Sequence, residues 1–317
     1  MLNQKQKDAL VASRLAILAS NNFIEINEAK IVDSIFRELD ELLELSLTEV
    51  CLKRFEFFKI PETSPDYFSE RVISLNDSEF IIAGIRFRGL DVNQPFVSVI
   101  PSKADLKEND LDQICNLVRK EFASFNPRYV QMTSSPKSSL GKNRGSVDRY
   151  TVVGDMSMML GNPIDGSNAV IELQAPEQID FYDLYLQEYE IFHHQTPSLK
   201  LEVRAESLED LKQSMSDGLL FKILINGTVA GVIAGLDRDY HGLNGVSILE
   251  EILFHQFRGR GHGVHIQRAF SNRIKAKANL LWGTISHMNE PSLRTALKNG
   301  RQITEVDYFF PLTQGTL

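Results

Sequence analysis

The segment FRGRGHG, Phe257–Gly263, is the most informative stretch of this chain. It follows an apolar run typical of a strand, Val246–Phe254, and precedes an amphipathic stretch typical of a helix, Gly263–Lys277. Alternating glycines let the backbone turn sharply and bring its N–H groups close to a ligand, because no Cβ stands in the way. The helix adds unsatisfied N–H groups and the positive end of its dipole, so the segment suits a pyrophosphate. A tight turn whose glycines serve only packing is the alternative interpretation.

Two familiar phosphate-binding loops do not fit this segment. A P-loop would end in Gly-Lys-Ser or Gly-Lys-Thr, which is missing here. A dinucleotide-binding fingerprint would place its glycines as G-x-G-x-x-G after the first strand of its domain. Here the strand before the glycines is the fourth in its half of the chain. The pattern is instead Arg-x-x-Gly-x-Gly, formed by Arg258, Gly261 and Gly263.

The second half of the chain predicts further strands and helices on both sides of the glycine segment. Its clearest turn is Asn226-Gly227 between two apolar runs, which is the typical sequence of a β-hairpin. The expected strands are Ala169–Leu173, Leu220–Ile225, Thr228–Ala234, Val246–Phe254, Leu280–Ser286 and Glu305–Phe310, and the expected helices are Asp180–His194, Ser207–Ser216, Gly263–Lys277 and Pro291–Lys298. This order indicates a mixed α/β or α+β domain, with antiparallel pairing first and a helical crossover later.

The first half predicts a similar but weaker order of elements. Apolar residues recur at three and four over Glu28–Phe58, which indicates one amphipathic helix or two. Strands are expected at Phe80–Phe87, Phe96–Ile100, Tyr129–Met132 and Tyr150–Val153, with a helix at Leu111–Phe125. The stretch Ser134–Gly145 is rich in Ser, Lys and Gly and predicts a mobile loop. We predict two domains, residues 1–165 and 166–317, divided within the Gly-, Pro- and Asn-containing segment Leu160–Asn168.

The composition is that of an ordinary globular protein, 43% hydrophobic and 24% charged, with a formal net charge of −8. Nucleic acids and anionic membranes select basic surfaces, so this charge argues against both as general partners. Apolar residues of Met1–Ser20 fall at helical spacing and are interrupted by Asp8 and Arg14, which indicates an amphipathic helix rather than an export signal. No uncharged apolar run is long enough to span a bilayer. With only two distant cysteines, Cys51 and Cys115, we expect a cytoplasmic protein.

The glycine segment and its surroundings resemble the GNAT superfamily of acyl-CoA N-acyltransferases. The pattern of Arg258, Gly261 and Gly263 is similar to motif A, an Arg/Gln-x-x-Gly-x-Gly/Ala loop between the fourth strand and the third helix. The preceding ILEEILFHQF, Ile248–Phe257, resembles that fourth strand and its exit. Downstream, LLWGTISHMNEPSLRTALKNG, Leu280–Gly300, resembles motif B, in which a strand ending in Asn precedes a short helix.

The resemblance covers roughly residues 168 to 312 and implies a fold. That fold is the acyl-CoA N-acyltransferase fold, an α/β (α+β) arrangement with a mixed, mostly antiparallel central sheet flanked by helices. In the first half, QPFVSVIPS followed by DLDQICNLVRKEF would be the corresponding fourth strand and third helix, but no glycine loop joins them. We therefore predict two such domains in tandem, of which the first is degenerate and lacks the cofactor loop.

The resemblance also implies an activity and its cofactor. The chain would transfer an acyl group from acetyl-CoA, or another acyl-CoA, to a primary amine of a small molecule or peptide, with no metal. The residues it implies at the cofactor are Leu253 and Phe254 on the strand, the loop Arg258, Gly259, Arg260, Gly261, His262 and Gly263, and Asn289 and Ser292 beyond it. Backbone N–H groups of the loop would hold the pyrophosphate, and the strand backbone would pair with the pantetheine arm.

The general acid of the family has no counterpart here. In many members a Tyr seven residues after the motif B Asn protonates the departing thiolate. Counted from Asn289, that position is Ala296. A CoA thiolate can leave with water as its proton source, so activity remains possible without the Tyr. A CoA-binding regulatory or interaction module without turnover is the alternative function.

Three residues are candidates for the base that deprotonates the amine: Glu250, Glu251 and His287. Adjacent strand residues point to opposite faces, so at most one of the two glutamates can face the cleft, and we prefer Glu250. His287, near the end of a strand, is an alternative base. The competing interpretations are solvated edge charges for the glutamates and a buried, hydrogen-bonded ring for the histidine.

Aromatic residues of the helix Asp180–His194 are candidates for contact with the acceptor. Tyr182 and Tyr185 belong to a stripe at helical spacing, and most such stripes belong to the core. The resemblance implies that the first helices wall the acceptor pocket, so these two tyrosines are expected near the substrate. His262 and His265 lie one helical turn apart without a third ligand, so we expect no metal site.

Overall fold

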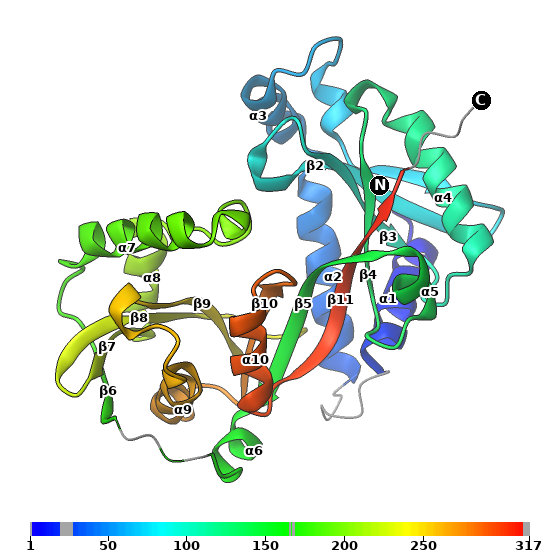
Figure 1. The fold of residues 1–317 in the computed structure, drawn as a ribbon. Helices are drawn as coiled ribbons and strands as arrows, with labels where there is room; N and C mark the ends of the chain where they lie inside the picture. Colours follow the sequence, from blue (N-terminus) through cyan, green and yellow to red (C-terminus); the bar gives the residue numbers. More distant parts are fainter. Residues whose placement is uncertain (1, 20–27, 165, 167–168, 313–317) are drawn as a thin grey trace. The chain divides into compact units, whose positions relative to one another are not determined.

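The computed structural model describes residues 2–19, 28–164, 166 and 169–312. The chain divides into two compact units, which Figure 1 shows in the colours of the sequence. The first unit runs to Arg149 and takes up the chain again from Glu305, and the second unit is Tyr150–Thr304.

The first unit contains five helices and a mixed sheet among its described residues. The helices are α1 (Gln4–Ala19), α2 (Glu28–Glu44), α3 (Thr48–Phe58), α4 (Glu108–Glu121) and α5 (Ser139–Arg144), and the strands are β1 (Arg71–Ser74), β2 (Phe80–Phe87), β3 (Pro95–Pro101) and β4 (Tyr129–Ser134). Strand β5 (Ser146–Asp155) begins in this unit and continues into the second from Tyr150. The strand order is β1-β2-β3-β4-β11, where β11 is Gln302–Pro311. Only β3 and β4 are parallel, and the neighbouring pairs are antiparallel.

The second unit has the same kind of sheet. Its helices are α6 (Met156–Gly161), α7 (Tyr182–Gln195), α8 (Leu208–Ser216), α9 (His262–Ile274) and α10 (Glu290–Lys298), and its strands are β6 (Ile171–Gln174), β7 (Leu220–Ile225), β8 (Thr228–Asp237), β9 (Gly245–Leu253) and β10 (Leu280–Ser286). The order is β5-β10-β9-β8-β7-β6, in which β9 and β10 are parallel and β6 to β9 pair antiparallel. The predicted fold class, a mixed and mostly antiparallel sheet flanked by helices, is confirmed.

One arrangement of elements occurs twice along the chain. First, α3 is followed by β1, β2, β3, α4, β4, α5 and β5, and later α8 is followed by β7, β8, β9, α9, β10, α10 and β11. Each copy makes two antiparallel pairings and then one parallel pairing, whose strands are joined by a crossover helix. The internal repeat expected from the sequence is therefore present at the level of topology.

The compact units differ from the predicted division at residue 165 in two places. Residues 150–164 lie in the second unit, and the chain from Glu305 lies in the first. The last strand causes the second difference, because β11 pairs with β4 over Val306–Pro311. This strand was expected to complete the sheet of the second domain, and strand order along the sequence does not reveal which edge a final strand joins.

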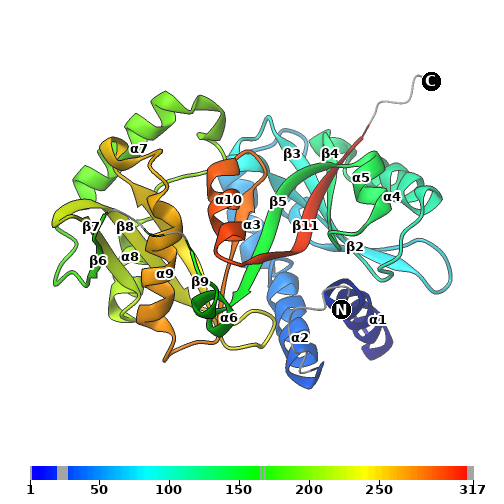
Figure 2. The ribbon, with the colours of Figure 1, turned by 60° about the horizontal axis from the view of Figure 1, so that its bottom comes forward.

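Both faces of the second unit's sheet are covered. The centre of β8 is buried without interruption over Ala230–Gly235, which is typical of a strand with helices on two sides. On one face, Tyr185 of α7 and Leu211 of α8 pack in a core with β7, β8 and β9. On the other face, α9 packs through Phe270 with residues from α6 and the same strands. Figures 1 and 2 show α7 and α9 on opposite sides of this sheet.

One predicted loop is a helix. Ser134–Gly145 was expected to be mobile, but Ser139–Arg144 forms α5. The hydroxyl of Ser138 accepts a hydrogen bond from the N–H of Gly141 at 3.2 Å and caps the helix. A Cβ on Gly141 would lie 2.5 Å from the ring of Tyr308, so the helix packs closely on β11. That contact comes from a residue far along the sequence, which local composition cannot show.

We expect Gly231→Ala to destabilise the second unit by about 3 kcal/mol. A Cβ at this position would overlap the backbone carbonyl oxygen of Ile252, and backbone of the neighbouring strand β9 cannot move aside cheaply. Gly161→Ala is the control, because nothing lies within 4 Å of its Cβ position. Urea unfolding of both variants checks this, and equal stabilities of the two would contradict it.

Candidate functional site

Strands β9 and β10 pair over only a short stretch. Their parallel register runs from Leu280↔Gly245 to Trp282↔Ser247 and continues no further within the described residues. On the opposite edge of β9, the register with β8 shifts so that Gly235 faces Ile248 while Ala234 faces Glu250. Leu249 is therefore the extra residue of a β-bulge, which bends a strand away from its partner. The edge of β9 that faces β10 carries no register pair from Ile248 onward.

The bulge decides which glutamate faces which helix. Before it, Val246 and Ile248 pack in the core on the α9 side of the sheet. After it, Leu249 and Ile252 pack in the core on the α7 side. The side chain of Glu250 also lies on the α7 side, where it contacts the tyrosines of α7. Strict alternation from Ile248 would have sent Glu250 to the α9 side instead.

Glu250 is buried between two tyrosine hydroxyls. It is 5% exposed. Its Oε2 accepts hydrogen bonds from the hydroxyl of Tyr189, at 2.8 Å, and from the hydroxyl of Tyr185. Burial raises the pKa of Glu250 to about 7, against the opposing effect of the two hydrogen bonds, and the nearby Glu206 raises it further. The carboxyl group can therefore exchange a proton near neutral pH.

The predicted substrate-contact tyrosines have protein partners in this structure. Tyr185 is fully buried, and its hydroxyl also accepts a hydrogen bond from the N–H of Glu206 at 2.6 Å. Tyr182 is partly buried and donates to the carbonyl oxygen of Glu206 at 3.2 Å. Burial and the charge of Glu250 raise the pKa of Tyr185 and of Tyr189, so both remain neutral donors. Tyr189 was not a predicted site residue, although its spacing of four from Tyr185 placed it on the same helical face.

Glu251 points to the other face and joins a polar network behind α9. Its Oε2 accepts a hydrogen bond from Gln267 Nε2 at 2.5 Å. The Oε1 of Gln267 accepts from Asn299 and from Arg301, each at 3.0 Å. Burial raises the pKa of Glu251, and Gln267 and Arg301 oppose that rise. Burial lowers the pKa of Arg301 to about 10, while Glu251 opposes this. The contacts of Glu251 thus hold α9 in place.

The glycine segment forms an open loop ahead of α9. Gly259 and Gly261 have φ angles of +74° and +76°, a region that other residues adopt at a cost. Gly261 is the N-cap of α9, and no side chain caps the helix. Among the described residues, no partner accepts the backbone N–H groups of Gly259, Gly261 or Gly263. This row of unsatisfied donors at a helix N-terminus suits an anion.

The two arginines of the loop differ in their environment. Arg258 forms an ion pair with Glu188 at 3.3 Å, so its charge is already compensated within the protein. Arg260 is exposed and lines a cavity of about 920 Å³ beside the start of α9. His262 and Lys298 line the same cavity. The positive groups next to the unsatisfied N–H row are therefore Arg260 and Lys298.

The predicted residues of β10 and α10 lie at the same edge of the sheet as the loop. His287 follows the end of β10 and is exposed, and Asn289 is the N-cap of α10. Because β9 and β10 are parallel, their carboxyl ends meet at one edge. The Oδ1 of Asn289 accepts a hydrogen bond from the N–H of Ser292 at 3.4 Å. Ala296 is fully buried, so a tyrosine would not fit there without displacing its neighbours.

The backbone of Leu253 and Phe254, where pantetheine was expected to pair, is partly occupied. The carbonyl oxygen of Leu253 accepts a hydrogen bond from Arg258 Nε at 2.5 Å. The N–H of Phe254 donates to the carbonyl of Ala230 at 2.8 Å. The part of β9 without a partner on the β10 side lies earlier, over Ile248–Ile252.

The corresponding place in the first unit carries a carboxylate at the start of its crossover helix. The Oδ2 of Asp110 accepts hydrogen bonds from the N–H of Lys107 at 2.8 Å and from Lys103 Nζ at 3.1 Å. The N–H at the N-cap of α4 is therefore bound by a carboxylate of the same helix. No glycine occurs in the connection of residues 102–107.

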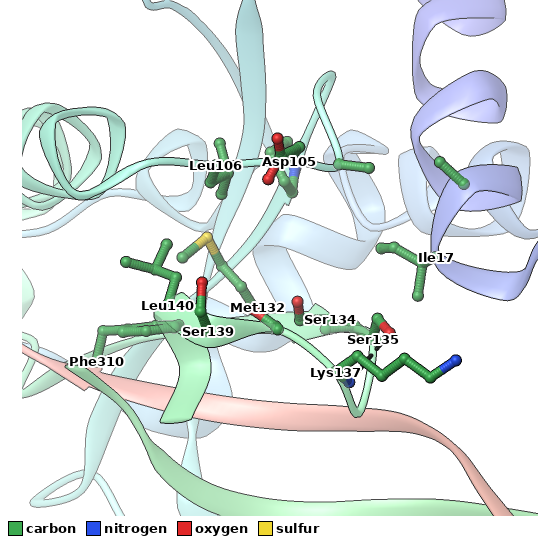
Figure 3. Close-up of a pocket in the computed structure, with 15 residues that line it drawn as sticks. Ile17, Asp105, Leu106, Met132, Ser134, Ser135, Lys137, Ser139, Leu140 and Phe310 are labelled. Atoms are coloured by element: carbon green, nitrogen blue, oxygen red, sulfur yellow. Dashed lines mark hydrogen bonds between the residues drawn. The ribbon is translucent and has the colours of Figure 1, made fainter. Parts of the chain in front are cut away.

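A cavity of about 320 Å³ lies near the ends of β3 and β4 in the first unit, at the place that corresponds to the loop edge of the second (Figure 3). Figure 3 shows the hydroxyl groups of Ser134 and Ser139 near the apolar side chains of Met132 and Leu140.

Two further observations concern other ligands. None of the helices described is long and apolar enough to cross a membrane. Within the described part of the chain, no three His, Cys, Asp or Glu side chains are grouped so as to hold a metal ion.

No model of a known protein family matches the sequence, and no curated protein matches it. Among solved structures, the chain is similar to an acetyltransferase of the GNAT family from Colwellia psychrerythraea, with a TM-score of 0.48 and 8% identity over 83% of this chain and 95% of that one. It is similar to a GCN5-related N-acetyltransferase from Sphaerobacter thermophilus, with a TM-score of 0.45 and 12% identity over 99% and 98% of the two chains. A tandem GNAT protein from the clavulanic acid biosynthesis pathway gives a TM-score of 0.41 and 11% identity over 97% and 96%.

Proposed function

We propose that the second unit is an N-acyltransferase that moves an acetyl group from acetyl-CoA to a primary amine of a small molecule or peptide. The observation that carries this proposal is the row of unsatisfied N–H groups over Gly259–Gly263, next to a strand whose edge is unpaired. The resemblance of this segment to motif A of the GNAT superfamily supplies the chemistry. The reaction would take place in the cytoplasm, where the free, buried Cys51 and Cys115 remain reduced.

The residues of the second unit fit an acyl-CoA in three places. The N–H groups of the loop and α9 would hold the pyrophosphate, with Arg260 and Lys298 adding positive charge. The free edge of β9 over Ile248–Ile252 would pair with the amides of the pantetheine arm, as a strand pairs with an added peptide. The thioester would then lie where β9 and β10 no longer pair, beside Asn289.

Glu250 would act as the base. An alkylamine is a cation in water, so it must lose a proton before its nitrogen can attack. Above pH 7 the carboxylate of Glu250 is available to take that proton, directly or through a water molecule. The nitrogen then attacks the thioester carbon, and the carbon–sulfur bond breaks. The nitrogen releases its second proton to water, and the thiolate leaves with the electron pair and takes a proton from water. The products are a neutral amide and the free thiol, and the proton that Glu250 took from the ammonium group passes to solvent.

Binding without turnover is the second candidate function, and Ala296 favours it. Its burial leaves no space for a tyrosine, so this helix offers no general acid at the position common in the family. Of the other two candidate bases, Glu251 is held by Gln267 in a hydrogen-bond network, and His287 lies in an exposed turn. A slow enzyme and a CoA-responsive module would both need the loop to bind CoA, so the loop does not distinguish between them.

The experiment that separates these functions is a thiol-release assay with acetyl-CoA and a panel of amines, amino acids and peptides. Mass spectrometry of the acceptor identifies the acetylated product. Thiol release together with a product heavier by one acetyl group supports the transferase. Tight binding of acetyl-CoA without any product supports the binding module. No binding of acetyl-CoA would overturn both.

A further inference from the structure

We propose that Glu188 of α7 is a positioning residue that fixes the glycine loop relative to Glu250. This inference rests on the proposed function, in which the loop holds the pyrophosphate and Glu250 takes the proton. Glu188 is buried, at 4% exposure, although its sequence surroundings resemble those of a solvated helix charge. A buried carboxylate needs partners, and its partners here all belong to the segment that leads into the loop.

Three groups of that segment contact the carboxylate. The backbone N–H of His255 donates to Oε2 of Glu188 at 2.7 Å, and Nδ1 of His255 lies 2.8 Å from Oε1. The Nη2 of Arg258 donates to Oε2 at 3.3 Å. One side chain of α7 therefore holds both ends of the short turn between β9 and the first glycine of the loop.

Arg258 extends this connection to the strand. Its Nε donates to the carbonyl oxygen of Leu253 at 2.5 Å, and its Nη2 also reaches the carbonyl oxygen of Glu188 at 3.2 Å. The guanidinium lies over the ring of Phe192, 5.3 Å from the ring centre. The last residue of β9, the turn and α7 are thus joined through one planar cation.

The loop itself has little else to hold it. Gly259 and Gly261 have no side chains, and nothing lies within 4 Å of either Cβ position. The loop position therefore depends on what precedes it and on the start of α9. Because the preceding turn is tied to Glu188, the direction in which the loop N–H groups point depends on α7.

The same helix holds Glu250. Tyr185, Glu188, Tyr189 and Phe192 follow the spacing of three, four and seven that lines one helical face. Tyr185 and Tyr189 donate to Glu250, while Glu188 and Phe192 contact Arg258. Two turns of α7 therefore set the distance between the proposed base and the proposed pyrophosphate site. Such spacing decides whether the thioester stands within reach of the amine.

Glu188→Gln tests this role. The amide keeps the shape but loses the charge and one acceptor oxygen, so it cannot keep all the contacts with Arg258 and His255. We expect the dissociation constant of acetyl-CoA to rise about tenfold, which is 1.4 kcal/mol. We expect faster amide hydrogen exchange over His255–Gly263 in the free protein, and an unchanged midpoint in the pH dependence of kcat. Glu190→Gln, the same change at an exposed position of the same helix, is the control.

Two further variants keep the proposal open to refutation. If Glu188→Gln does not fold, His255→Ala replaces it, because that half-exposed side chain can be removed with a small loss of stability. Tyr189→Phe removes a hydrogen bond to Glu250 and leaves the contacts of Glu188 in place. It is expected to shift the midpoint in the pH dependence of kcat while leaving the affinity for acetyl-CoA unchanged. Exchange over His255–Gly263 that equals the wild type in Glu188→Gln and in His255→Ala would overturn the positioning role. That exchange is measured without ligand, so failure of the proposed function would appear separately, as absence of acetyl-CoA binding.

Discussion

Glu250→Gln is expected to lower kcat/KM for acyl transfer by about 10²–10⁴-fold, the range that a positioned general base contributes. The amide cannot accept the proton of the amine. The wild-type rate is expected to rise with pH through about 7, where the buried carboxyl group of Glu250 ionises. In the variant that rise disappears. Initial rates measured between pH 5.5 and 9 check both statements.

The same variant has a predicted effect on stability. The pKa of Glu250 rises from the ordinary value of 4.5 to about 7 on folding, so the folded chain binds more protons than the unfolded chain between these pH values. Stability therefore falls as pH rises from about 4.5 to 7, because the unfolded chain releases its proton first. Glu250→Gln removes this loss, and its stability relative to wild type is expected to increase over that window.

Glu251→Gln discriminates between the two adjacent glutamates. Its side chain lies on the α9 side and holds Gln267, so the expected effect is on the stability of α9 and on acetyl-CoA affinity. The pH midpoint near 7 is expected to remain. If Glu251→Gln loses the pH midpoint near 7 and Glu250→Gln keeps it, then Glu251 is the base, and the bulge does not place Glu250 in that role.

Gly261→Val is expected to weaken acetyl-CoA binding by about 100-fold, or 2.7 kcal/mol. A β-branched residue does not tolerate the φ angle of +76° at this position, so the loop must take another path. The N–H groups then no longer point to one place. Losing one or two hydrogen bonds to a charged group, at about 1.5–3 kcal/mol each, accounts for this loss. Isothermal calorimetry with acetyl-CoA measures it.

Gly218→Val is the matched control for that variant. Gly218 has a similar φ angle of +67° and follows the end of α8, so the substitution brings the same backbone strain elsewhere. Both variants are expected to lose comparable stability, and only Gly261→Val is expected to lose affinity. If both variants lost acetyl-CoA affinity equally, the loss would come from backbone strain at any position and not from the change in the loop.

Local sequence predicts those parts of the site whose physics is local. The turn at the glycines and the helix that follows it depend on a few neighbouring residues, and both lie where the pattern placed them. The hairpin at Asn226-Gly227 is of the same kind. These features need no knowledge of which strands pair. Asn289 was expected to end the strand, but β10 ends at Ser286 and Asn289 caps α10.

The features that sequence could not predict depend on partners far along the chain. The bulge at Leu249 follows from pairing with β8 and places Glu250 on the α7 side, which simple alternation from Ile248 does not give. From the sequence alone, Glu188 is expected to be an exposed charge on the helix surface. In the structure it is buried by contacts with His255 and Arg258. Strand β11 pairs with β4, which no local pattern specifies. Each of these depends on contacts between segments that lie far apart in the sequence.

The measurement that tests the central claim most directly compares acetyl-CoA with acetylpantetheine, which shares the thioester arm but has no diphosphate. Calorimetric titration of both ligands into wild type and Gly261→Val separates the contribution of the diphosphate to the binding affinity from that of the remaining contacts. We predict that acetylpantetheine binds wild type at least about 100-fold more weakly than acetyl-CoA, and that Gly261→Val weakens only acetyl-CoA. Equal affinity of the wild type for the two ligands would contradict the assignment of the loop at the start of α9 as the diphosphate site.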